Sequence, residues 1–264
     1  MFRGLIRLAL AALVAAGIST SAAAAPVRHA GGTLAYCSDI TYPPEEFYKG
    51  TKPVGSDIDI GTEVAKRLGM KASFHNTGFD GIIAALLAKK CDAIISGMND
   101  TAERRKQVAF VDYLSVGQSL MVKKGNPKKI HKLSDLSGKR VSVEVGTTNK
   151  QFLDKESARL KRQGKAKIDV VTFPKDTDAA AALKTGRVDA YFGDSPVVAY
   201  YIERDTSFAF AGSPVNPIPV GIALRKGDSK IPKIKSAIAK MYSDGTMLKI
   251  LRRWHMDDFA LKRK

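Results

Sequence analysis

The chain has 264 residues, with 43 Lys and Arg against 26 Asp and Glu, so its formal net charge is +17. Its hydrophobic content of 44% excludes an intrinsically disordered chain, because disorder combines high net charge with few apolar residues. Two cysteines exclude a small domain held together by disulfides. The charge by itself favours an acidic partner such as nucleic acid or anionic lipid, since net charge governs association rather than fold.

The N-terminus has the pattern of a secretory signal peptide. Arg3 and Arg7 accompany an apolar run over residues 8–18, and residues 19–25 are small and rich in alanine. The run is too short to cross a bilayer comfortably, although an N-terminal membrane anchor is the alternative interpretation. We predict that residues 1–24 are removed on export to the periplasm, and that loss of the two arginines lowers the charge from +17 to +15.

Strand and helix patterns alternate along the rest of the chain. In the helix predicted over residues 57–68, for example, Ile60, Val64 and Leu68 share one face and Gly69 ends it. The predicted strands are residues 33–38, 71–75, 92–96, 119–123, 140–145, 169–173, 189–193 and 221–225. The predicted helices are 57–68, 80–89, a short one begun by Thr101, 133–136, 149–162, 176–185, 195–204, 230–243 and 246–255. This order indicates an α/β fold with mostly parallel sheets flanked by helices.

Two stretches of the chain resemble each other. Residues 89–93 and 185–190 both join a helix to a strand, and each strand leads to a polar loop, at residues 96–99 and at Asp194. The pattern predicts two similar lobes whose loops face each other. Ligands of open α/β sheets bind beyond the carboxyl ends of the strands, so these loops are the predicted site.

Seven segments, in order and spacing, resemble the periplasmic solute-binding proteins of polar amino-acid ABC transporters, the bacterial extracellular solute-binding proteins of family 3. The segments are SDITYPP (38–44), VGSDIDIG (54–61), FDGIIAALLAKKCDAIISGM (79–98), TAERR (101–105), GKRVSVEVGTT (138–148), GRVDAYFGD (186–194) and VGIALRKGD (220–228). The resemblance covers residues 33–259.

The resemblance implies a two-lobed periplasmic-binding-protein fold of type II. Lobe 1 is expected to comprise residues 26–113 and 220–264, and lobe 2 residues 118–213, with hinges near 113–117 and 214–219. It also implies a monomeric, non-catalytic receptor that closes around an amino acid and delivers it to a membrane permease. No cofactor, metal or nucleic acid is expected.

The ligand's α-carboxylate requires a cationic partner once it is buried. Arg104 matches the arginine that binds this group in the family, and a guanidinium can pair with a carboxylate through two hydrogen bonds. Thr147 and Thr148 open a helix, where free amides favour an anion. The alternatives are a surface ion pair for Arg104 and ordinary helix capping for the threonines.

The α-ammonium is expected to meet Asp194, where the family places a carboxylate. Ser96, Gly97 and Asn99, on the matching loop of lobe 1, would complete its hydrogen bonds. Gly97 stands where some relatives carry serine, so one hydroxyl is missing here. The alternative role for Asp194 is to cap the helix that begins at the next residue.

The ligand's side chain is expected to lie between Tyr42 and Phe79, although Phe79 could instead be core. Asp39 and Glu144 then remain as surplus carboxylates in a closing cleft, which favours a cationic amino acid such as arginine, lysine, ornithine or histidine. If Glu144 points away from the cleft, a neutral polar amino acid is equally expected. Glu45 would add negative charge, or be a solvated residue at the rim.

Other chemistry finds less support in the sequence. The four histidines share no metal-binding spacing, and no nucleotide-binding or hydrolase motif is present. A dehydratase acting on cyclohexadienyl acids shares this fold, and Glu144 could be its general acid.

Cys37 and Cys91 are predicted to be free thiols, because an extended strand would separate them by roughly 13 Å, beyond the reach of a disulfide.

Overall fold

The computed structural model describes residues 32–261, so the predicted signal segment lies outside the described residues. The strands are β1 Thr33–Ser38, β2 Thr41–Tyr42, β3 Glu46–Lys49, β4 Lys52–Val54, β5 Lys71–Asn76, β6 Ala93–Ile94, β7 Val108–Lys123, β8 Arg140–Glu144, β9 Asp169–Phe173, β10 Ala190–Asp194 and β11 Phe208–Arg225. The helices are α1 Ser56–Arg67, α2 Ile82–Leu87, α3 Ala102–Arg105, α4 Thr148–Arg162, α5 Asp176–Lys184, α6 Ser195–Arg204, α7 Ile231–Ser243 and α8 Thr246–Arg253, with 3-10 turns at Phe79–Gly81, Leu133–Leu136 and Asp257–Phe259.

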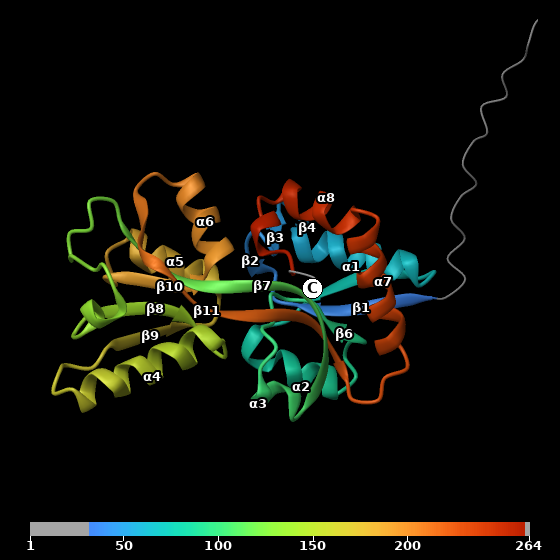
Figure 1. The fold of residues 1–264 in the computed structure, drawn as a ribbon, viewed down its shortest axis with the longest axis horizontal. Helices are drawn as coiled ribbons and strands as arrows, with labels where there is room; N and C mark the ends of the chain where they lie inside the picture. The colour runs from blue at the N-terminus through green and yellow to red at the C-terminus, as the bar shows by residue number, and fades with distance from the viewer. Residues whose placement is uncertain (1–31, 262–264) are drawn as a thin grey trace, which may run out of the picture.

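The α/β alternation predicted from the sequence is confirmed, and the strands form one large sheet. Its order is β5-β1-β6-β11-β7-β10-β8-β9, and β2, β3 and β4 form a small separate sheet. The outer strands pair in parallel, whereas β7 and β11 run antiparallel to each other through the middle. Two lobes result, with β1, β5, β6, α1–α3, α7 and α8 in lobe 1 and β8–β10 and α4–α6 in lobe 2 (Figure 1).

The two central strands are longer than the sequence predicts. β7 has 16 residues and β11 has 18, whereas only residues 119–123 and 221–225 had strand patterns. Register shifts occur at Val215 and Ile218, inside the proline-rich part of β11. Proline cannot donate a ladder hydrogen bond, so this segment pairs irregularly and does not alternate like an ordinary strand. These strands carry the chain from one lobe to the other.

Each lobe has its own apolar core. Tyr36, Ile60, Ile222 and Met241 are fully buried in lobe 1, where α1 and α7 cover the sheet. In lobe 2 the neighbouring residues Tyr191 and Phe192 belong to two clusters, because successive strand residues point to opposite faces. Helices therefore cover both faces of the sheet, and the strand ends of the two lobes meet between the cores.

The prediction of two free thiols was wrong. Cys37 and Cys91 form a disulfide with their Cα atoms 5.7 Å apart. Strand β6 contains only two residues and Cys37 pairs with Ile94, so Cys91 lies outside the strand. The chain bends there, with Asp92 donating its backbone N–H to Ala35 O at 2.7 Å. The distance estimate failed because it extended the strand rise through a bent segment.

Within residues 32–261, no helix is long and apolar enough to cross a membrane. In the same part of the chain, no cluster of three or more His, Cys, Asp or Glu side chains could hold a metal ion.

Candidate functional site

A small cavity of about 10 Å³ lies between the lobes, where the predicted loops meet. Its lining residues are Asp39, Tyr42, Phe79, Gly97, Asn99, Glu144, Thr147, Asn149 and Asp194. The other predicted site residues, Ser96, Arg104 and Thr148, are buried next to it and hydrogen-bond to its lining residues or to their neighbours. This volume is about that of one water molecule, so the lobes must separate before the cavity can hold an amino acid.

Arg104 is buried beside this cavity, and its local structure follows from the sequence. Thr101 caps α3, accepting a hydrogen bond from the backbone N–H of Arg104 at 3.2 Å. The guanidinium donates to Asn99 O at 2.8 Å and to Gly146 O at 3.2 Å, and it lies 5.2 Å from the centre of the Phe79 ring. Burial lowers its pKa to about 10 although Asp194 opposes this shift. No carboxylate pairs with it in the described residues, so it can accept an anion.

The first turn of α4 faces Arg104 from lobe 2. Thr147 Oγ1 caps the helix, accepting from Lys150 N at 3.2 Å and donating to Glu144 O at 2.8 Å. Thr148 Oγ1 donates to Asn99 Oδ1 at 2.5 Å. The capping role and the proposed anion site are therefore compatible, because the hydroxyl of Thr147 caps while the unpaired amides of the first turn stay available.

Asp194 is 2% exposed and ends β10. Its side chain makes no capping hydrogen bond to α6, so the capping alternative does not account for it. Asn149 Nδ2 donates to its Oδ1 at 3.1 Å, and burial raises its pKa to about 6. A buried carboxyl of this kind favours a cation at the cavity.

Asn149 was not among the predicted residues. It lines the cavity and holds Asp194, and its own Oδ1 has no hydrogen-bond partner within the described residues. The available signal was its place directly after Thr148, in the first turn of α4.

Asp39 and Glu144 enter the cavity from opposite lobes. Asp39 accepts from Thr41 Oγ1 at 2.7 Å and from Phe79 N at 2.8 Å. Glu144 faces the cavity, and its Oε1 is buried without a hydrogen-bond partner in the described chain. Burial, and then the nearby carboxyls of Asp176 and Asp39, raise the pKa of Glu144 well above its ordinary value. Carboxyl groups therefore line this end of the cavity, and the charge of Lys175 acts on Asp39 from outside the lining.

Glu45 is not a solvated residue at the rim. It is 1% exposed, and burial followed by the charges of Asp57 and Asp194 raises its pKa well above the ordinary value. Asp176, which also raises the pKa of Glu144, accepts hydrogen bonds from Tyr191 at 2.5 Å and Tyr201 at 2.9 Å. The acidic surroundings of the cavity are thus more extensive than the sequence predicted.

Several hydrogen bonds join the lobes across the cavity. The Arg104 guanidinium donates to Gly146 O, the Thr148 hydroxyl donates to Asn99 Oδ1, and Asp194 N donates to the Tyr42 hydroxyl at 3.3 Å. Each bond has one partner in each lobe, so the site is assembled only when the lobes are together.

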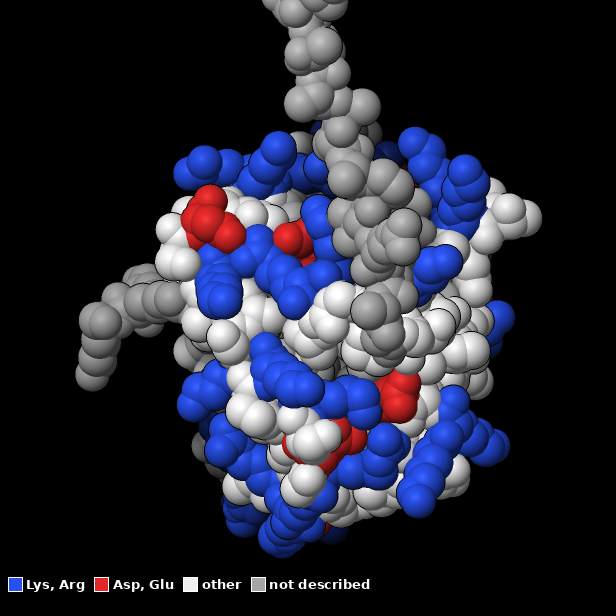
Figure 2. Space-filling view, turned by 90° about the vertical axis from the view of Figure 1, so that its right-hand side faces the viewer, with Lys and Arg blue, Asp and Glu red and all other residues white. Residues whose placement is uncertain are grey.

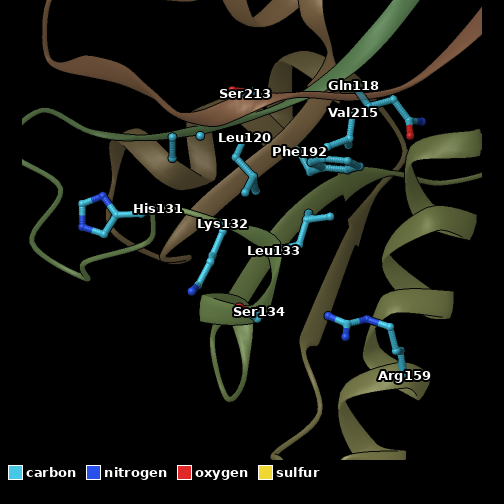
Figure 3. A pocket seen from close by; sticks show the side chains of 12 residues that line it. Gln118, Leu120, His131, Lys132, Leu133, Ser134, Arg159, Phe192, Ser213 and Val215 are labelled. Atoms are coloured by element: carbon cyan, nitrogen blue, oxygen red, sulfur yellow. The ribbon is translucent and has the colours of Figure 1, made fainter.

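A larger cavity of about 340 Å³ lies within lobe 2, near β11 (Figure 3). Leu120, Phe192 and Val215 form its apolar wall, and Lys132 and Arg159 lie at its edge. No carboxyl side chain lines it, so it offers no partner for an ammonium. A free amino acid carries both charges, and of these two cavities the interlobe one, with Asp194 in its lining and Arg104 beside it, provides groups of both signs.

The outer surface has the opposite electrostatic character. Lysines and arginines cover much of the face at the lobe 1 end, with few acidic residues among them (Figure 2). Lobe 2 also has exposed lysines, including Lys124, Lys161 and Lys165. The positive charge is therefore spread over both lobes, around a buried acidic site.

Comparisons with known proteins agree with this architecture. A family model described as "Bacterial extracellular solute-binding proteins, family 3" matches residues 34–257. Two relatives from Escherichia coli strain K12 are the putative ABC transporter arginine-binding protein 2, 31% identical over 93% of this chain and 97% of its own, and an L-cystine-binding protein, 33% identical over 84% and 82%. An ancestral arginine-binding protein solved with arginine superposes with a TM-score of 0.78, at 40% identity over 85% of this chain and 98% of its own.

Proposed function

Because the chain belongs to the bacterial extracellular solute-binding proteins of family 3, we propose that it is a periplasmic receptor for a cationic amino acid of the arginine, lysine, ornithine or histidine type. Amino-acid-binding receptors of ABC transporters are the rule among its relatives. The ligand would lie in the interlobe cavity, with its α-carboxylate on Arg104 and the amides of the first turn of α4. Its α-ammonium would meet Asp194.

The preference for a cationic side chain depends on one observation. Glu144 faces the cavity with a buried, unpaired oxygen, opposite Asp39, and no lysine or arginine is among the residues that line the cavity. A guanidinium or ammonium would supply the missing donor and compensate the buried charge. Tyr42 and Phe79 would contact the apolar part of the side chain.

The lobes are proposed to comprise residues 26–113 with 220–264, and residues 118–213. The hinges would be near 113–117 and 214–219, where β7 and β11 cross between the lobes. Hinge closure absorbs its dihedral changes over a few such residues. Closure would bring Arg104, Thr148 and Asp194 together around the ligand.

The receptor would be exported through residues 1–24, act as a monomer and deliver its ligand to the membrane permease of an ABC importer. We propose no catalytic role, because Arg104 and Asp194 together hold an intact α-amino acid by both charged groups. The dispersion of exposed lysines over both lobes disfavours a nucleic-acid interface, which needs a continuous basic stripe.

A thermal-shift screen of the mature chain tests the proposal. The panel comprises arginine, lysine, ornithine, histidine, glutamine and cystine, each at the same concentration. Stabilisation follows RT ln(1 + [L]/Kd), so a cationic amino acid should raise the melting temperature most. A larger shift with glutamine would contradict the cationic preference, and no shift with any amino acid would contradict the receptor function.

A further inference from the structure

Two acidic side chains are buried in lobe 1 directly behind the ligand loop. Glu46 lies in β3 and Asp57 in the first turn of α1, and both are 0% exposed. Neither forms a salt bridge with a lysine or arginine within residues 32–261. Buried carboxyls without a cation cost free energy, so they need another form of compensation.

Their hydrogen bonds lead to the predicted ligand contacts. Asp57 Oδ2 accepts from Gly97 N at 2.8 Å, and both Asp57 oxygens accept from the Tyr113 hydroxyl at 2.7 Å. Glu46 Oε1 accepts from Ser96 Oγ at 2.8 Å. Ser96 Oγ in turn accepts from Asp39 N at 2.8 Å. Each acid therefore holds one of two consecutive loop residues, and Ser96 connects Glu46 to Asp39.

One proton between the two acids satisfies both of them. The charge of Asp57 raises the pKa of Glu46, so the two carboxyl groups lie close together, and a proton between them would relieve their repulsion. Glu46 Oε2 is buried without a hydrogen-bond partner within the described chain. The charged groups near Glu46 are Asp57 on α1, the adjacent Glu45 and Asp39 after β1, and all are acidic. Asp57 already has two donors, Gly97 and Tyr113, so the proton belongs on Glu46.

We propose that Glu46 and Asp57 are positioning residues that share one proton and fix the Ser96–Gly97 peptide for the ligand's ammonium. A trans peptide is planar and its N–H and C=O point in opposite directions. With the Gly97 N–H held by Asp57, the Ser96 carbonyl is directed away from that acid, and Asp57 polarises it as an acceptor. This inference rests on the proposed function, because the ammonium belongs to the bound amino acid.

The proton makes the positioning dependent on pH. Burial, and then the charges of Asp57 and Glu45, raise the pKa of Glu46 well above its ordinary value. Because the pKa is raised, Glu46 is fully protonated at low pH, and the stabilisation that its proton gives the loop is lost as the pH rises through the folded-state pKa. Ionised Glu46 would repel Asp57 and release the loop.

The test compares wild type with Glu46→Gln, Glu46→Leu and the control Glu63→Gln, an acid on the solvent side of α1. Affinity for L-arginine is measured by calorimetry from neutral to alkaline pH. We expect Glu46→Leu to weaken binding about tenfold, because Ser96 loses its acceptor, and Glu46→Gln to restore it. In wild type and Glu63→Gln, the affinity for L-arginine should decline toward alkaline pH as Glu46 ionises. Glu46→Gln should lack this part of the decline. Identical pH profiles for wild type and Glu46→Gln would overturn the proposal.

A second readout uses the ligand-free protein and does not depend on the proposed function. Infrared spectra at neutral pH should contain a carbonyl band of a protonated carboxylic acid that Glu46→Gln lacks and Glu63→Gln retains. An unchanged band in Glu46→Gln would show that Glu46 is ionised and would overturn the shared proton. Failure of wild type to bind any amino acid would instead count against the proposed function, and the infrared result would still decide the proton's position.

Discussion

Replacing Glu144 by glutamine tests the ligand's side-chain partner with little change of shape. The amide keeps an oxygen at the cavity but removes the negative charge that a cationic side chain would pair with. Glu144 is 3% exposed, so solvent screens this charge little. A hydrogen bond to a charged group contributes about 1.5–3 kcal/mol, which corresponds to a loss of affinity of roughly 10- to 150-fold for arginine.

The assay is titration calorimetry of the mature protein with arginine and, separately, with glutamine, whose side chain is neutral. Affinity for glutamine should stay the same or rise in Glu144→Gln, because a neutral side chain gains nothing from a carboxylate. Asp154→Asn, on the exposed side of α4 where Asp154 pairs with Lys150, is the matched control in lobe 2. Equal losses for arginine and glutamine, or no loss for arginine, would refute the reasoning.

Three further changes have defined expected results. Arg104→Ala should abolish measurable calorimetric binding of every α-amino acid, because it removes the carboxylate's cation; retained affinity would contradict the site. Because burial places the pKa of Asp194 near 6 without ligand, and an ammonium would lower it, affinity should fall as the pH drops below about 6, by at most about tenfold per pH unit and separately from the alkaline decline assigned to Glu46. A flat calorimetric profile down to pH 5 would exclude Asp194 as the ammonium partner. Replacing Cys37 and Cys91 by serine should lower the free energy of unfolding by about 4 kcal/mol in urea titrations, since the disulfide closes a loop of 54 residues; an unchanged midpoint would show that the bond adds no stability.

The family resemblance predicted most of the residues that line or adjoin the interlobe cavity, and many of them lie at element ends that have clear local signals. Thr101 marks the start of α3 and so places Arg104 one turn inside, and Thr147 marks the start of α4 in the same way. Asp194 follows a short apolar strand and precedes a proline in the first turn of a helix. Capping residues and strand ends are local features, so a single sequence reveals them.

The buried acids could not be predicted in the same way. Glu46 and Asp57 have the appearance of surface residues, and the small β2–β3–β4 sheet that buries Glu46 has no strong strand pattern. Whether an acid is solvated or buried depends on contacts between distant segments, here between β3, α1 and the loop at Ser96. The disulfide was missed for a related reason, because the bend before β6 depends on a pairing with β1.

The central claim is that the interlobe cavity holds both charged groups of an amino acid, the carboxylate on Arg104 and the ammonium on Asp194. Calorimetry of the wild-type protein with L-arginine, agmatine and argininic acid tests it most directly, since agmatine lacks the carboxylate and argininic acid lacks the α-ammonium. We expect arginine to bind with a Kd of about 1 μM or lower and each analogue to bind at least roughly 100-fold more weakly, because either loss leaves a buried charge without its partner. Agmatine or argininic acid binding as tightly as arginine would contradict the account.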